Sequence, residues 1–348
     1  MTMTNESPQA PLTDVAVLIL FFNRPDRLKQ VFDAVRRARP SRLFLYQDGP
    51  RSEADMPALE ACRKVVAEVD WQCDVRRNYC TENHGCDPSE YYAQRWAFSM
   101  AEQCVVLEDD DIPSDDFIPF CKAMLDRYAD DERIGMIAGF NHEEHTTDIG
   151  DDSYFFTTNC SIWGWASWRR AFERWEPDYA FLRRPESVAR LEALIRERRL
   201  RKDFLATCRA HAATGIEYYE TLIQAALLLN GQMSIVPRHN MISNIGVTDE
   251  STHYAGSIAT TPRGLRRIRK KPCRAGGRLW QRCCRVWASV IGRLSARGGA
   301  FCERPGRGPA FRGRNGPARS ALGAFPCSVR AGPARRCAAR AGPGPLLR

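Results

Sequence analysis

Val105-Val106-Leu107-Glu108-Asp109-Asp110-Asp111 is a short apolar run that ends abruptly in carboxylates. An apolar run of this length predicts a buried strand, and an open α/β sheet binds its ligands at the carboxyl ends of its strands. Adjacent acids repel one another, and a divalent cation such as Mg²⁺ or Mn²⁺ would remove that repulsion while holding phosphates. The alternative is a solvated acidic turn that caps the next helix.

The chain on both sides of this run alternates apolar strands with amphipathic helices. Val15–Phe22 is a continuous apolar run, typical of a strand that is buried on both faces. We expect a helix from Pro25, further strands at Leu43–Tyr46, Trp71–Val75, Ile134–Gly139 and Ser234–Val236, and further helices at Glu53–Val69, Tyr91–Met100, Phe117–Tyr128, Glu186–Ala213 and Glu217–Leu229. Such alternation with short connections predicts an α/β fold, a mostly parallel sheet with helices on both faces.

Charge and composition divide the chain at about residue 259. Residues 261–348 hold 22 of the 51 Lys and Arg residues, 14 of the 24 glycines and 9 of the 21 prolines, but a single acid, Glu303. The first 260 residues therefore carry a net charge of −12, which argues against nucleic-acid binding. We expect residues 13–258 to fold, and the polar residues 1–12 and the basic tail 259–348 to be disordered.

Two other interpretations of the tail remain open. Leu279–Leu294 carries tryptophans among arginines and could lie on an anionic membrane surface. The bias towards Arg, Gly, Ala and Pro, with odd cysteines, also fits an out-of-frame translation. No apolar run is long enough to span a membrane, and the N-terminus does not resemble a signal peptide. We therefore expect a cytoplasmic protein, with peripheral contact at the inner membrane face through the tail.

Polar residues at the ends of other predicted strands would share one sheet edge with the acids. Arg24 could meet a diphosphate or pair with Asp26, and Asp48 could bond a base or ribose or be a plain turn aspartate. The aromatic residues crowded into 153–175 could form a platform for a sugar ring or simply belong to the core. Three further candidates, each with an ordinary surface role as its alternative, are Glu217 and Glu220 as general bases and His253 as a phosphate or metal contact.

Taken in order, these features resemble the GT-A glycosyltransferases, which have the nucleotide-diphospho-sugar transferase fold. The residues that carry the resemblance are Asn23-Arg24-Pro25, Gln47-Asp48-Gly49, Asn83-His84-Gly85-Cys86, Leu107–Pro113, Gly164–Arg169, and Val236–Gly246 with Thr252-His253. The pattern is similar to a bacterial group often labelled glycosyltransferase family 2 or hemolysin-like. It also resembles the catalytic domain of N-acetylglucosaminyltransferase I, an inverting enzyme. The likeness covers about residues 13 to 255.

The resemblance implies metal-dependent transfer of a sugar from a nucleotide-diphospho-sugar, most readily a UDP-sugar, to a hydroxyl of a glycan or glycolipid, as in bacterial surface glycan synthesis. It implies that Asp110 holds Mn²⁺ or Mg²⁺, while Asp111 only begins the next turn. The expected contacts with the sugar donor are Glu108 and Asp109 at its ribose or sugar, Asp48 at its nucleoside, Asn23 and Arg24 near its uracil or diphosphate, and Trp165 and His253.

The same resemblance points to a catalytic base at the start of a helix. The family has a Trp-Asp pair there, whereas this chain has Tyr219-Glu220, so Glu220 is the expected base and Glu217 its substitute. Two other functions stay open. A sugar-phosphate nucleotidyltransferase would need a glycine-rich basic loop after the first strand, where Phe22-Asn23-Arg24-Pro25 has no glycine. A membrane-surface or nucleic-acid binding protein would act through the basic tail.

Overall fold

The computed structural model describes residues 9–215 and 219–246. Glu217, His253, the first eight residues and the basic tail lie outside the described residues, so the expectations for them are not examined by the structure. Within the described part of the chain, no helix is both long enough and apolar enough to cross a membrane.

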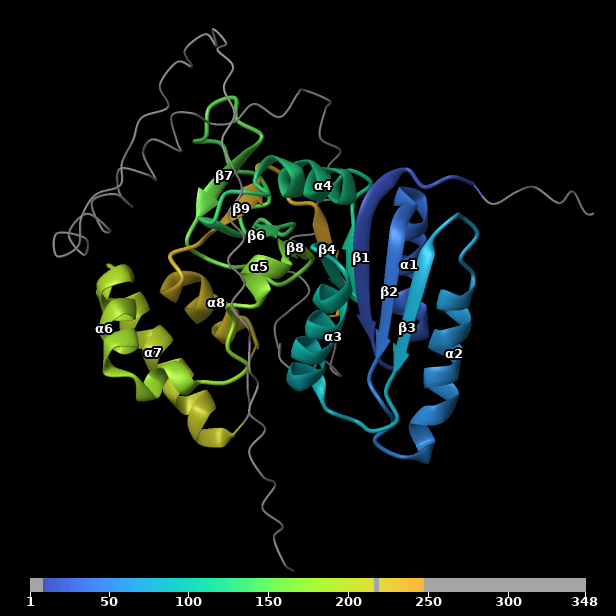
Figure 1. The fold of residues 1–348 in the computed structure, drawn as a ribbon, viewed down its shortest axis with the longest axis horizontal. Helices are drawn as coiled ribbons and strands as arrows, with labels where there is room; N and C mark the ends of the chain where they lie inside the picture. Colours follow the sequence, from blue (N-terminus) through green and yellow to red (C-terminus); the bar gives the residue numbers. More distant parts are fainter. Residues whose placement is uncertain (1–8, 216–218, 247–348) are drawn as a thin grey trace, which may run out of the picture. The chain divides into compact units, whose positions relative to one another are not determined.

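An eight-stranded sheet with the order β3-β2-β1-β4-β8-β6-β9-β7 forms the centre of the fold (Figure 1). β1 (Thr13–Phe21) pairs in parallel with β2 (Pro40–Gln47) and β4 (Gln103–Glu108), and β2 with β3 (Asp74–Tyr79). β6 (Ile134–Ala138) and β9 (Met233–Pro237) are also parallel. Only β8 (Trp165–Trp168) and β7 (Tyr154–Thr157) pair antiparallel with their neighbours in this sheet. The predicted mostly parallel α/β sheet is confirmed.

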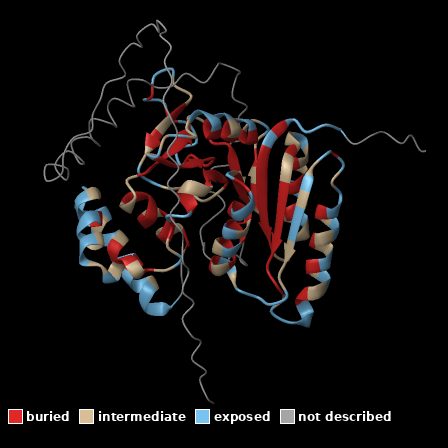
Figure 2. Ribbon diagram, viewed as in Figure 1, coloured by how far each residue is buried: buried red, intermediate tan, exposed pale blue. Residues whose placement is uncertain are grey.

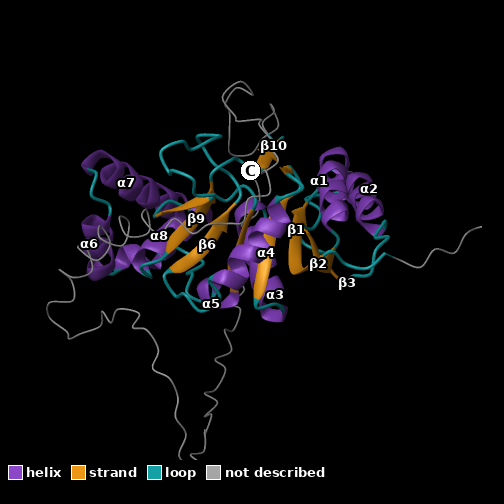
Figure 3. Ribbon diagram, turned by 90° about the horizontal axis from the view of Figure 1, so that it is seen from above, coloured by secondary structure: helices purple, strands orange, loops and turns teal. Residues whose placement is uncertain are grey.

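Helices cover both faces of this sheet, which is why β1 is apolar from Val15 to its end (Figures 2 and 3). Val15, Val17 and Ile19 pack with α1 (Pro25–Ala38), α2 (Met56–Ala67, preceded by the short η1, Glu53–Asp55) and α4 (Phe117–Arg127). Ala16 and Leu18 pack with α3 (Cys86–Met100), α5 (Arg169–Phe172) and α8 (Tyr219–Leu229) on the other face. From Val15 to Phe21 the strand therefore has no solvated side, and apolar residues occupy every position instead of alternating with polar ones.

A third layer lies outside α8. The segment η2 (Ala180–Arg183), α6 (Pro185–Leu194) and α7 (Arg198–Thr214) packs on the face of α8 that carries Leu222 and Leu228. The single helix expected over 186–213 is wrong. The chain breaks at Ile195, whose backbone is extended, and Glu197 then caps α7 by accepting hydrogen bonds from the N–H groups of its first turn.

Two other expected boundaries were misplaced. The strand expected at Trp71–Val75 begins only at Asp74; Trp71 instead forms an isolated parallel bridge with Gln9, and its Nε1 donates to the Pro40 carbonyl at 2.9 Å. The helix expected from Tyr91 begins at Cys86, five residues earlier. The second error matters for function, because the residues added to the start of this helix include Asp87 and Glu90, which face the acids.

Most of the aromatic block proves to be core. β7 and β8 run through it, and Tyr154, Phe156, Trp165, Trp168, Phe172 and Trp175 are all buried. Of the two interpretations left open by the sequence, packing in the core therefore accounts for most of these rings.

Candidate functional site

A cavity of about 640 Å³ opens at the carboxyl ends of β1, β2 and β4. In the strand order β3-β2-β1-β4, β2 and β4 lie on opposite sides of β1. The connection from β1 to β2 runs through α1, and the connection from β3 to β4 runs through α3. Ligands bind at such switch points, because the connecting loops there diverge and leave a crevice. The lining of the cavity includes Asn23, Arg24, Asp48, Glu108 and Asp109. The structure thus brings together five of the residues that the sequence singled out.

Arg24 binds the acidic run directly. Its guanidinium forms an ion pair with Asp109 and another with Asp110, at 2.9 Å from Nη1 to Oδ2, while Asp109 and Asp110 are 3% and 6% exposed. Burial alone would lower the pKa of Arg24, but the charges of the two aspartates outweigh it and raise that pKa above its usual value. Arg24 therefore neutralises part of the acid cluster, which neither interpretation from the sequence foresaw.

The remaining negative charge is still crowded. Burial raises the pKa of Glu108 well above its ordinary value, and the charges of Glu90 and of the neighbouring aspartates raise it further. Burial raises the pKa of Asp109 to about 6, although Arg24 opposes the shift. Oxygen ligands in excess negative charge are the donor set that a hard divalent cation prefers. The residues present therefore fit the implied Mn²⁺ or Mg²⁺.

Asp111 supports the site through hydrogen bonds. The expectation that it only begins the next turn is wrong. Asp111 opens β5 (Asp111–Pro113), is 0% exposed, and accepts hydrogen bonds from the Gly164 N–H at 2.8 Å and from Asn244 Nδ2 at 3.0 Å. Asn244 closes β10 (Ile242–Asn244), which pairs antiparallel with β5, and its Nδ2 also donates to Asp110 at 3.1 Å. The predicted 236–246 motif thus holds the acids in place.

Asp48 shapes the loop that follows β3. Its carboxylate accepts hydrogen bonds from the backbone N–H groups of Gly49, His84 and Gly85, at 2.9–3.0 Å, and from Asn83 Nδ2 at 2.8 Å. A carboxylate offers about four lone-pair positions, and all of them are used. The loop passes so close that a Cβ on Gly49 would lie 2.4 Å from the Glu82 backbone. In this structure Asp48 therefore acts on the loop.

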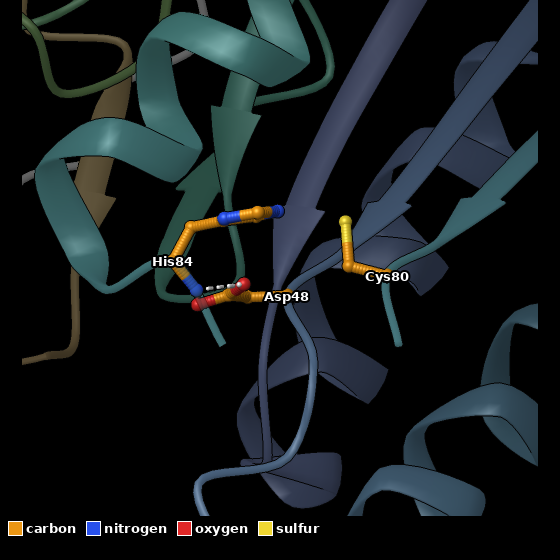
Figure 4. A group of neighbouring side chains, drawn as sticks. All are labelled: Asp48, Cys80 and His84. Carbon is orange, nitrogen blue, oxygen red and sulfur yellow. Dashed lines mark hydrogen bonds between the residues drawn. The ribbon is translucent and has the colours of Figure 1, made fainter. Parts of the chain in front are cut away.

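Asp48 also belongs to a group of potential metal ligands that the sequence reasoning missed. One ligand atom each of Asp48, Cys80 and His84 lies within 4.8 Å of the others, which is compatible with a divalent metal. Figure 4 shows, however, that Asp48 already binds the His84 backbone N–H, and the Cys80 thiol donates to the Tyr46 hydroxyl at 3.2 Å. A thiolate and an imidazole would suit Zn²⁺ better than Mg²⁺. The four-residue spacing of Cys80 and His84 was the available signal.

Glu90 is a second residue that the sequence reasoning missed. It lies in the second turn of α3, is 6% exposed and lines the cavity beside Glu108, with Gln94 Nε2 donating to it at 3.3 Å. Burial raises its pKa well above the usual value, and the charges of Asp111 and Asp87 add to that rise. The positions 87, 90 and 94 recur at helical spacing, a polar stripe that could have revealed this face.

Two of the predicted site residues lie elsewhere. Trp165 is fully buried in the core, where its Nε1 donates to the Tyr219 hydroxyl at 3.0 Å and its ring packs against Trp175. Glu220 lies in the first turn of α8 beside Cys160, whose Sγ donates to the Glu220 carbonyl at 3.6 Å. Glu220 does not line the cavity of the acids.

No protein-family model matches this chain, and no curated protein matches it either. Among solved structures, the chain is similar to the glycosyltransferase GlyE of Streptococcus pneumoniae TIGR4, with a TM-score of 0.36 and 9% sequence identity over 82% of this chain and 64% of that one. It thus spans less than two thirds of that protein's length. A second similar structure is 4-diphosphocytidyl-2C-methyl-D-erythritolsynthase of Anaerococcus prevotii DSM 20548, with a TM-score of 0.36 and 9% identity over 68% of this chain and 94% of that one.

Proposed function

We propose that this chain is a metal-dependent glycosyltransferase that moves a sugar, with inversion, from a UDP-sugar to a hydroxyl of a glycan or glycolipid in bacterial surface glycan synthesis. The observation that carries the proposal is the meeting of Arg24 with the acids Glu108, Asp109 and Asp110 beside the cavity at the switch point. The cavity volume of about 640 Å³ suits a small-molecule ligand such as a nucleotide sugar, since small-molecule sites span about 300–1,000 Å³.

Arg24, Asp48 and the acids have separate roles in this proposal. Asp110 would hold Mn²⁺ or Mg²⁺, and such a cation would neutralise charge on the leaving nucleoside diphosphate. Glu108 and Asp109 would accept hydrogen bonds from hydroxyls of the sugar donor. Arg24, one third exposed, would extend part of its guanidinium to the diphosphate. Asp48 would hold the 83–85 loop around the nucleoside, since its own oxygens are occupied.

The proposal also covers partners and location. The net charge of −12 over the first 260 residues disfavours nucleic acid as a partner. A cytoplasmic enzyme whose basic tail touches the inner membrane face would meet glycolipid acceptors there. The tail lies outside the described residues, so this part of the proposal is supported by composition alone.

The proposal is tested by thermal shift against a panel of nucleotide sugars with and without Mn²⁺. One nucleotide class should raise Tm, and the rise should require the metal, because a ligand that binds only the folded state stabilises it. Turnover of that nucleotide sugar should then release the nucleoside diphosphate. Release of pyrophosphate would instead identify a nucleotidyltransferase, and the lack of any nucleotide-dependent shift would refute the proposal.

The rise in Tm caused by Mn²⁺ alone should grow as the pH increases through about 6. In the metal-free protein the pKa of Asp109 is raised to about 6 from 3.8, so the folded state keeps this proton to a higher pH than the unfolded chain does. The metal-free protein therefore loses stability between about pH 4 and about pH 6, and a cation, which favours ionised carboxylates, restores it above that range. A rise of equal size at about pH 5 and about pH 7.5 would contradict the metal site.

Replacing Glu220 with Gln should lower sugar transfer by about 100-fold or more while nucleotide binding is retained. Removal of a general base has a cost of this order, and Gln keeps the shape of the side chain. Glu90→Gln is the matched comparison, because Glu90 lines the cavity and its charge acts on Tyr219 at the start of α8. We expect Glu90→Gln to weaken binding of the nucleotide sugar. A larger loss of transfer in Glu90→Gln, with binding intact, would assign the base to Glu90.

A further inference from the structure

A second cavity, of about 440 Å³, lies on the other side of the first turns of α3. Ser89 and Glu90 line the first cavity, while Asp87 and Tyr91 line the second. The start of α8 closes the second cavity, since the Tyr219 backbone N–H donates to Asp87 at 3.3 Å. Figure 1 shows the first turns of α3 and α8 near each other, below β4 in that view.

The two cavities are close neighbours. Tyr219 lines the second cavity and its backbone N–H donates to Asp87, while burial and the charges of Glu90 and Glu108 raise the pKa of its hydroxyl. Asp87, in the second cavity, in turn raises the pKa of Glu90 in the first. Residues of α3 that line the two cavities, such as Asp87 and Glu90, are thus one helical turn apart.

The wall of the second cavity combines aromatic rings with charged groups. Tyr91, Tyr92 and Trp175 supply the rings, and Asp87, Arg95 and Glu176 supply the charges. A lipid chain would take these charged groups further out of water, which is costly. A saccharide suits both parts of the wall, because the C–H face of its ring packs on aromatic rings while its hydroxyls bond charged groups.

Two buried polar atoms of this wall have no hydrogen-bond partner among the described residues. They are Trp175 Nε1, which can only donate, and Glu176 Oε2, which accepts when the carboxyl is ionised. Buried polar atoms are almost always paired, so two such atoms on adjacent residues call for an explanation. A hydroxyl group both accepts and donates, and it is therefore the simplest group that satisfies this pair.

We propose that the second cavity binds the acceptor as a saccharide, with a sugar ring against Tyr91, Tyr92 and Trp175 and its hydroxyls at Trp175 and Glu176. The identification of this saccharide as the acceptor rests on the proposed glycosyltransferase function. The proposal assigns the sugar of the acceptor to this cavity, because an apolar alcohol would cover the two unpaired atoms without bonding both of them.

The test measures binding of methyl glycosides of common hexoses and N-acetylhexosamines by saturation-transfer NMR, without any sugar donor. At least one glycoside should bind wild-type protein, and Trp175→Phe should weaken that binding about threefold to tenfold, the worth of one neutral hydrogen bond. Tyr92→Ala should weaken it similarly, and this ring is 45% exposed, so the variant is expected to fold. Octanol serves as the apolar alcohol and should not compete.

Trp168→Phe is the matched control. Trp168 Nε1 already donates to the Leu125 carbonyl at 3.2 Å, so its loss should lower Tm without changing glycoside binding. Trp175→Phe breaks no hydrogen bond within the described residues, but it shortens a buried ring that packs on Trp165 and Phe172, so Tm should fall in this variant too and only glycoside binding should separate the two variants. Unchanged glycoside binding in both Trp175→Phe and Tyr92→Ala, competition by octanol, or no glycoside binding at all would overturn the saccharide site.

The outcomes also separate this inference from the proposed function. If nucleotide sugars shift Tm but no glycoside binds, the glycosyltransferase proposal stands and the saccharide cavity fails. If glycosides bind through Trp175 but no nucleotide sugar shifts Tm, the cavity is a saccharide site and the transfer reaction fails.

Discussion

Asp110→Ala is expected to abolish sugar transfer while leaving the fold intact. The side chain is buried, it is ion-paired with Arg24 and accepts a hydrogen bond from Asn244, and it is the proposed direct ligand of the cation. A metal ion contributes several kcal/mol of transition-state stabilisation, so we expect a loss of about 10³-fold or more. Removing the carboxylate also relieves like-charge repulsion on Glu108 and Asp111, so Tm should not fall sharply.

The measurement is nucleoside diphosphate release against Mn²⁺ concentration, with Tm recorded for each variant. Asp111→Ala is the matched control among the acids, because Asp111 is wholly buried and its oxygens accept hydrogen bonds from Gly164 and Asn244. This variant should lose stability, since it leaves those N–H groups unpaired. Transfer by Asp110→Ala at a rate near that of the wild type would remove Asp110 from the metal site.

Arg24→Met is expected to lower the free energy of unfolding by about 2 to 3 kcal/mol. Breaking a buried ion pair typically costs about 3–5 kcal/mol, and the cost should be smaller here because the Arg24 side chain is 33% exposed while Asp109 is 3% exposed. The stability is lost because Asp109 and Asp110 would remain buried without the Arg24 guanidinium. The loss of stability should be smaller at about pH 5, where Asp109 takes up a proton.

Urea denaturation of a double-mutant cycle measures this coupling. Asp109→Asn should recover much of the stability in the Arg24→Met background, because it removes one of the stranded charges. Lys122→Met breaks an exposed pair with Asp126 on α4 and is expected to cost under about 1 kcal/mol. Equal losses from Arg24→Met and Lys122→Met, with no rescue by Asp109→Asn, would show that the acids do not depend on Arg24.

Local sequence patterns predicted the elements whose surroundings are simple. The apolar run in β1 and the apolar residues Leu28, Val31 and Phe32 in α1 are all buried. The pattern of apolar residues along the chain was therefore enough to predict which positions are buried. Prediction failed where a side chain's role depends on a distant partner. Trp71 lies outside β3: its backbone forms a bridge with Gln9, and its ring bonds Pro40 and packs on Phe32.

The acidic run that follows β4 illustrates the division most clearly. Its sequence by itself determined that a buried strand ends in crowded carboxylates, because apolar length and adjacent charge are local properties. Only the tertiary structure decided how those charges are distributed: Arg24 takes two of them, and Gly164 and Asn244 bind Asp111. Electrostatic energy depends on distance through space and on burial, and neither can be read from spacing along the chain.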